Sequence, residues 1–157
     1  MRLNKFLAQT GIGSRRKCDE FIKNRLIKIN GKIVTDFSCK ISEKDNIQYK
    51  NKYIEIEENK YYLILNKPKG YVCSSNDQFN RKIIFDLIEI KERMYSIGRL
   101  DYDTTGIIII TNDGDLCHFL SHPKFGFTKK YHVLTDKKLN TANINIISKG
   151  ILINKNK

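Results

Sequence analysis

The chain has 157 residues and a formal net charge of +12 at pH 7, which arises from 29 Lys and Arg against 17 Asp and Glu. Its hydrophobic content of 40% is enough to bury a core, which excludes a disordered polyelectrolyte, and its length suits one ordinary domain or two small ones. So much positive charge favours a polyanionic partner, above all nucleic acid, over an acidic small molecule. The excess is greatest in residues 1–35, where Asp19 and Glu20 are the only acids.

The four cysteines are widely spaced, at positions 18, 39, 73 and 117, and no two of them form a C-x-x-C pair. This spacing predicts neither a zinc ribbon nor a disulfide framework, so no metal is expected and free thiols fit a reducing compartment. The N-terminal residues are too polar for a signal peptide, and no apolar run approaches the length of a membrane span. These features predict a soluble cytoplasmic protein with no membrane partner.

Two helices and a hairpin are predicted for the first 35 residues. Apolar residues at helical spacing predict a helix from residue 3, which Gly11 ends. Ser14 can cap a second helix, and polar and apolar residues then alternate in "LIKINGKIV" around Asn30 and Gly31. That pair is well suited to a two-residue type I′ turn. The polar segment of residues 43–58 is interpreted as the last strand of this unit and a linker.

Three basic residues, Arg15, Arg16 and Lys17, lie where the second helix begins. A solvated helix start is the ordinary interpretation of such a charge run. Positive charge is unfavourable at this end of the helix dipole, however, and a bound phosphate would remove the penalty. Together with the helices and the hairpin, the G-x-G and S-R-R motifs closely resemble the small RNA-binding domain first recognised in a ribosomal small-subunit protein. The resemblance implies RNA contacts from one set of residues: Arg2, Lys5, Arg15, Arg16, Lys17, Asn30 and Lys32.

A second unit is predicted from residue 59 to residue 157, which leaves residues 1–58 for the RNA-binding domain and its linker. "YYLIL" is typical of a buried strand and "NKPKG" of a turn. The spacing in "RKIIFDLIEIKERM" predicts a helix with one apolar face, formed by Ile83, Ile84, Leu87 and Ile88. "GIIIIT" predicts a central strand covered on both faces, "DLCHFLSHP" a short helix that Pro123 ends, and "KKYHVLT" a further strand. This irregular order of helices and strands predicts an α+β fold.

Four aspartates lie around the apolar run of "GRLDYDTTGIIIITNDGDL". Asp113 and Asp115 are interpreted as turn and helix-start residues. A magnesium site at Asp101 and Asp103 is disfavoured, because no phosphate loop or other metal motif accompanies the pair. Asp101 lies at the mouth of the apolar strand, near Arg99, and is the candidate nucleophile or base. Burial can desolvate such a carboxylate, and the guanidinium can keep it ionised. The residues alone indicate no reaction.

Three segments resemble a known family in their sequence and their order: "LNKPKGYVCSSND", "GRLDYDTTGIIIITNDGDL" and "TKKYHV". With the N-terminal domain they resemble the ribosomal small-subunit pseudouridine synthase family, and "NKPKGYVCSS" favours the small-subunit branch. The resemblance implies an enzyme that isomerises one uridine of small-subunit ribosomal RNA to pseudouridine, without a cofactor or metal. It also implies a catalytic domain with a mixed, mainly antiparallel sheet, a monomer, and ribosomal RNA or the assembling small subunit as partner.

By the same resemblance, three residues form the active site. Asp101 matches the family's catalytic aspartate in G-R-L-D, and Arg99 matches the arginine of that motif, which can pair with Asp101 and contact the RNA. Tyr131 in "KKYHV" matches the active-site tyrosine, whose ring can stack on the uracil. Asp103 and Thr104 are expected to support the loop. Whether Asp101 attacks the ribose or abstracts one of its protons stays open.

Family members continue well past residue 157 and add strands and a basic motif near the active site. Two functions therefore stay open. The first is a pseudouridine synthase, whole or in part, and the second is a non-catalytic ribosomal-RNA-binding protein left by truncation of such an enzyme. In a shortened catalytic sheet, apolar surface of the "GIIIIT" strand is expected to be open to solvent or to another chain.

Overall fold

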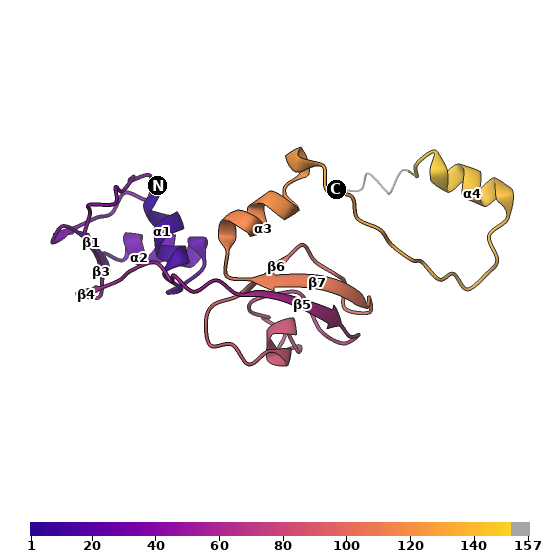
Figure 1. Cartoon of the computed structure of the whole chain (residues 1–157), viewed down its shortest axis with the longest axis horizontal. Coiled ribbons are helices and arrows are strands. Elements are labelled where there is room, and N and C mark those ends of the chain that lie inside the picture. Colours follow the sequence, from indigo (N-terminus) through magenta and orange to yellow (C-terminus); the bar gives the residue numbers. More distant parts are fainter. Residues whose placement is uncertain (152–157) are drawn as a thin grey trace. The chain divides into compact units, whose positions relative to one another are not determined.

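The computed structural model describes residues 1–151. Its N-terminal part has two helices followed by two hairpins (Figure 1). The four strands form one antiparallel sheet in the order β2-β1-β3-β4. The elements are α1 (Leu3–Gln9), α2 (Arg15–Lys23), β1 (Ile27–Ile29), β2 (Lys32–Ile33), β3 (Ile47–Tyr49) and β4 (Lys52–Tyr53).

Local chemistry explains where these elements begin and turn. The Ser14 hydroxyl oxygen accepts a hydrogen bond from the Lys17 N–H at 3.1 Å, which confirms the predicted cap of α2. Asn30 and Gly31 have positive φ, 49° and 81°, as the predicted type I′ turn requires. The single strand predicted within residues 43–58 is instead a second hairpin, because the two residues between β3 and β4 also have positive φ.

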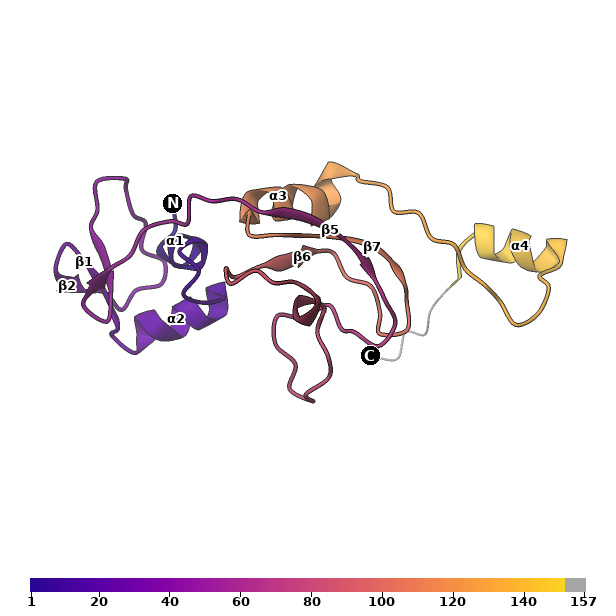
Figure 2. The same ribbon diagram turned by 60° about the horizontal axis from the view of Figure 1, so that its bottom comes forward.

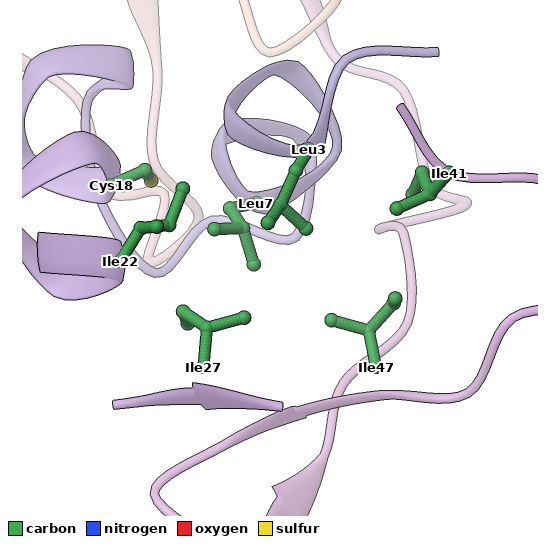
Figure 3. Packing of buried hydrophobic residues seen from close by; sticks show 7 residues of the cluster. All are labelled: Leu3, Leu7, Cys18, Ile22, Ile27, Ile41 and Ile47. Carbon is green, nitrogen blue, oxygen red and sulfur yellow. The ribbon is translucent and has the colours of Figure 1, made fainter. Parts of the chain in front are cut away.

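A first hydrophobic core lies between the two helices and the sheet (Figure 3). Leu3 and Leu7 of α1 point toward Ile27 of β1 and Ile47 of β3. Burial of one Leu or Ile side chain stabilises a fold by about 1.5–3 kcal/mol, so this cluster fixes the helices against the sheet. Its buried members are Leu3, Leu7, Cys18, Ile22, Ile27, Ile41 and Ile47.

A second antiparallel sheet carries the loop that contains the predicted catalytic aspartate. Its order is β5-β7-β6, with β7 in the centre as predicted (Figure 2). Helix α3 follows β7 and contacts β6. A second buried cluster supports the sheet: Cys73, Ile84, Met94, Ile108 and Ile110. The elements are β5 (Tyr62–Lys67), a 3-10 helix (Ile84–Leu87), β6 (Tyr95–Ile97), β7 (Gly106–Thr111), α3 (Gly114–Ser121) and a second 3-10 helix (Pro123–Phe125).

The helix predicted for residues 81–94 is wrong, because only one 3-10 turn forms there. The Val72 N–H donates to the Lys82 carbonyl oxygen at 2.9 Å, and this strand-like contact holds the start of the segment extended. The Asp86 carboxylate then accepts the Ile83 N–H at 2.9 Å and closes a short turn. Local side-chain bonds of this kind compete with a regular helix.

The prediction that β7 is covered on both faces is wrong for the described residues. Ile108 and Ile110 are buried, whereas Ile107 is 74% exposed. Ile64, on the same outer face of the sheet in β5, is 76% exposed. Within the described residues, the outer face of β5 and β7 is therefore an open apolar surface.

The chain divides into two compact units, residues 1–127 and the part that begins at Thr128. The first unit holds both hydrophobic cores. The domain boundary predicted near residue 58 falls between these cores and stays a prediction. Within residues 1–151, every helix is too short or too polar to cross a lipid bilayer.

The second unit contains one described helix, α4 (Thr141–Ser148), which was not predicted. The side-chain oxygen of Asn140 caps it by accepting the Asn143 N–H at 2.8 Å. The strand predicted for residues 129–135 is wrong, because these residues form no ladder with any described strand. A strand needs such a partner for its backbone groups.

Candidate active site

Residues 98–105 connect β6 to β7 and present the predicted catalytic aspartate. The Thr104 N–H donates to the Asp101 carbonyl oxygen at 3.1 Å, which closes a tight turn. The Asp101 side chain is exposed. Its carboxylate forms no ion pair with a described residue, so it is free to meet a substrate.

A buried lysine fixes the backbone of this turn. Lys67 is the last residue of β5 and has no exposed surface. Its ammonium donates to four backbone carbonyl oxygens: Thr104 at 2.8 Å, Asp101 at 2.9 Å, Pro68 at 3.1 Å and Tyr102 at 3.3 Å. A buried charge is tolerated only with such partners. The turn that carries Asp101 is therefore held through its own backbone.

Sequence reasoning alone misses Lys67, because "NKPKG" is typical of an exposed turn. The signal that could have found it is the alternation along β5. Lys67 shares a strand face with Leu63 and Leu65, which pack on the second core. A lysine on a buried strand face indicates that hydrogen-bond acceptors lie within reach of its ammonium.

Two more contacts hold the loop. The Leu100 N–H donates to Cys73 Sγ at 3.3 Å, and the Gly70 N–H donates to the Tyr102 carbonyl oxygen at 3.0 Å. Gly70 has φ of 83°, a conformation that favours glycine, so the turn after β5 needs this residue. Thr104 supports the loop as predicted, since its N–H donates to Asp101 within the loop and its carbonyl oxygen accepts from Lys67 of β5.

Asp101 lines a cleft of about 440 Å³ together with two arginines, Arg81 and Arg99. The structure thus brings the two predicted residues of the G-R-L-D motif to one cleft. The ion pair expected between Arg99 and Asp101 is absent, because neither side chain is paired within the described residues. The desolvated surroundings expected for Asp101 are absent too, since its side chain is exposed.

Tyr131 belongs to the second unit, in a stretch without regular secondary structure. Its side chain is 64% exposed. The role of Tyr131 at the active site stays a prediction.

The aspartates that follow β7 serve helix α3, as predicted. The Asp113 carboxylate caps α3 by accepting the N–H groups of Asp115 and Leu116, both at 3.0 Å. The bond from Leu116 is the main reason that the pKa of Asp113 lies below its usual value. Among residues 1–151, no three His, Cys, Asp or Glu side chains are grouped so that they could hold a metal ion.

Four of the predicted RNA-binding residues are exposed and free of ion pairs within the described chain: Arg2, Arg15, Arg16 and Lys32. Arg15 and Arg16 lie in the first turn of α2, which contains no acidic residue. Among the described residues, neither Arg15 nor Arg16 has an anionic partner at this helix end. These side chains can therefore turn to phosphates without breaking an ion pair.

The other three predicted RNA-binding residues are engaged within the protein. Lys5 forms an ion pair with Asp115 at 2.6 Å, and Lys17 forms one with Glu20 at 2.7 Å. The hydrogen bond to Glu20 raises the pKa of Lys17. The side-chain oxygen of Asn30 accepts a backbone N–H just before β3 at 2.9 Å. These residues would have to change partners before they could bind RNA.

Two family models match the chain: the S4 domain over residues 1–47 and RNA pseudouridylate synthase over residues 61–157. The ribosomal large subunit pseudouridine synthase B of Bacillus subtilis is 43% identical over 131 residues, which cover 83% of this chain and 53% of that protein. The ribosomal small subunit pseudouridine synthase A of Haemophilus influenzae is 37% identical over 135 residues, which cover 85% and 58%. A crystal structure of a pseudouridylate synthase matches at 35% identity with a TM-score of 0.45, over 80% of this chain and 54% of that one.

The chain thus spans little more than half the length of these two curated relatives. Their names include both ribosomal subunits, so the small-subunit branch favoured by the sequence stays a prediction. The predicted α+β fold, with a small RNA-binding domain before part of a catalytic domain, is confirmed. Because the RNA pseudouridylate synthase model matches residues 61–157 and the Bacillus subtilis relative is 43% identical over 83% of this chain, the chain belongs to the RNA pseudouridylate synthase family.

Proposed function

We propose that this protein isomerises a uridine of ribosomal RNA to pseudouridine, with Asp101 as the catalytic carboxylate. The reaction breaks the bond from ribose C1′ to uracil N1 and forms one from C1′ to C5, while the proton lost from C5 is balanced by one gained at N1. It is redox-neutral, so it consumes no oxidant or reductant. One observation carries the proposal: an exposed, unpaired carboxylate lines a cleft on a turn that the buried Lys67 fixes.

A rigid turn suits this chemistry, because a displacement of about 1 Å in a catalytic group can cost roughly a hundredfold in rate. Lys67 holds the carbonyl oxygens of Asp101 and of Thr104, which lie on the same turn. These bonds hold the backbone from which the Asp101 side chain extends. Such a group can attack the ribose or take one of its protons.

RNA has to present a single base to this carboxylate. A uridine reaches Asp101 only after it leaves its stack, and the guanidinium of Arg99 in the same cleft offers charge to the distorted backbone. The exposed Arg15 and Arg16 of the S4 domain would hold the RNA elsewhere. Tyr131 enters the proposal as the ring that stacks on the uracil, on its sequence match alone.

The finer part of the proposal is the target. The motif "NKPKGYVCSS" supports a uridine of the small-subunit RNA. The Haemophilus influenzae relative has a small-subunit name, whereas the Bacillus subtilis relative has a large-subunit name. The test therefore reads both ribosomal RNAs.

The experiment maps pseudouridine in ribosomal RNA from cells without the gene and from the same cells complemented with single variants. Asp101→Asn keeps the size and polarity of the side chain but removes its charge, and we expect the target uridine to stay unmodified. Asp103→Asn is the matched control, because Asp103 is also exposed and lines the same cleft. We expect this variant to restore the modification.

Two results would contradict the proposal. Modification by the Asp101→Asn variant at more than about a tenth of the wild-type level would reject Asp101 as the essential carboxylate. A deletion strain that keeps every ribosomal pseudouridine would reject the activity and would favour an RNA-binding protein without chemistry.

A further inference from the structure

The segment between β5 and the first 3-10 helix is built around one carboxylate. The Asp77 side chain accepts the backbone N–H groups of Phe79 at 3.1 Å and Arg81 at 2.9 Å. It also accepts Arg81 Nη2 at 2.6 Å and Arg81 Nε at 3.2 Å. Only 7% of the Asp77 side chain is exposed, against 47% of the Arg81 side chain. The buried carboxylate thus binds the guanidinium, while about half of the Arg81 side chain stays exposed to solvent.

Two further contacts hold Arg81 in place. Its guanidinium lies over the Phe79 ring, 5.1 Å from the ring centroid. The segment ends in the contact between the Val72 N–H and the Lys82 carbonyl oxygen at 2.9 Å, which ties it to the chain after β5. The hydrogen bonds from Arg81 are also the main reason that the pKa of Asp77 lies at about 2. The carboxylate is therefore charged at every pH at which the protein would work.

The fixed guanidinium belongs to the same cleft as Asp101. Asp77 occupies Nε and one hydrogen of Nη2, and no other described side chain pairs with Arg81. Donors on Nη1 and Nη2 are therefore available to a ligand. A planar guanidinium that is already immobilised loses little further entropy when it forms two bonds to a phosphodiester.

We propose that Arg81 is a phosphate-binding residue of the active-site cleft, which takes a phosphodiester beside the uridine on which Asp101 acts. Asp77 is its positioning residue. The inference rests on the proposed function for the identity of the ligand as RNA. It adds a residue outside the G-R-L-D motif and assigns the "NDQFNRK" segment to RNA binding.

The opposite view is that the Asp77 and Arg81 pair only braces its own loop. The two views predict opposite signs for one variant. Asp77→Asn removes a negative charge from a cleft that binds a polyanion, so RNA affinity rises if only net charge matters. If Arg81 has to be held in place, the affinity falls although the protein has become more positive.

The experiment measures binding of a fluorescein-labelled RNA hairpin with uridines in its loop to the full chain, by anisotropy over a range of salt concentrations. We expect Arg81→Gln to weaken binding about tenfold and to lower the slope of log affinity against log salt by about 0.7–0.9, the value for one lost phosphate contact. We expect Arg81→Lys to keep the slope and to recover only part of the affinity, because the ammonium cannot form two parallel bonds. Lys91→Gln is the matched control, since it removes an exposed positive charge outside the cleft.

An Arg81→Gln variant with the wild-type slope and affinity, or an Asp77→Asn variant that binds more tightly, would overturn the inference. If Arg81→Gln fails to fold, Arg81→Lys provides the test. Wild-type affinity in that variant would show that the two parallel bonds of the guanidinium are not used. Isomerisation is scored separately. If Arg81→Gln weakens RNA binding but the wild-type protein has no isomerase activity, the proposed function alone is rejected. If the wild-type protein is active but Arg81→Gln leaves the salt slope unchanged, this inference alone is rejected.

Discussion

Replacement of Lys67 by methionine tests whether the catalytic turn is held by the buried ammonium. Methionine has a similar length and no donors, so the change removes the bonds to Thr104, Asp101 and Pro68 at 2.8, 2.9 and 3.1 Å. Each hydrogen bond from a charged donor contributes about 1.5–3 kcal/mol. Removing the buried ammonium also removes its desolvation penalty, which offsets this loss by several kcal/mol. We expect a net loss of about 3 kcal/mol in the free energy of unfolding of the second sheet.

Urea unfolding followed by far-UV circular dichroism measures this loss. With an m-value of about 2 kcal/mol/M, the midpoint should fall by about 1.5 M. Lys69→Met is the matched control, because Lys69 is exposed in the same turn and should move the midpoint by less than about 0.3 M. Hydrogen exchange should show faster exchange of the Thr104 amide in the Lys67→Met variant. A midpoint within about 0.3 M of the wild type would refute the view that Lys67 organises the turn.

Three further predictions concern the RNA-binding helix, the cleft loop and the open sheet face. Replacing Arg15, Arg16 and Lys17 by Ala should lower the salt slope of RNA binding by about 2 or more, and an unchanged slope would mean a solvated helix face. The pKa of Asp77 is lowered from 3.8 to about 2, so its contribution to stability is complete above about pH 4 and is lost as the pH falls toward 2; a carboxyl carbon NMR titration with a midpoint near 4 would contradict this. Ile107→Lys should leave the urea midpoint unchanged, because this side chain is 74% exposed, and a clear fall of the midpoint would show that the outer face is packed.

Sequence reasoning succeeded where a few adjacent residues decide the structure. The cap by Ser14 and the positive φ values at Asn30 and Gly31 depend on groups within three positions of each other. Asp101 and Arg99 of the G-R-L-D motif line one cleft, and their roles there stay predictions. These features could be predicted because distant parts of the chain hardly influence them.

It failed where a distant partner decides. Lys67 is defined by carbonyl oxygens that lie 34 to 37 positions further along the chain. The expected helix at residues 81–94 does not form, because Lys82 is hydrogen-bonded to Val72 and Asp86 closes a short turn. The expected desolvation of Asp101 was inferred from an apolar neighbour in sequence, whereas exposure depends on what packs across the cleft. The residues next to Asp101 in sequence do not show what packs across the cleft.

The two hydrophobic cores draw on separate stretches of the chain, and this has a consequence for the order of folding. The buried members of the first core end at Ile47, whereas those of the second begin at Cys73. A protein is synthesised from its N-terminus, and units with short-range contacts form early. Lys67 meets its last acceptor, Thr104, only when 37 more residues have followed it. We therefore expect a nascent chain to have a folded S4 domain while the turn of Asp101 is still unformed, so that capacity to hold RNA precedes the catalytic geometry in the life of each molecule.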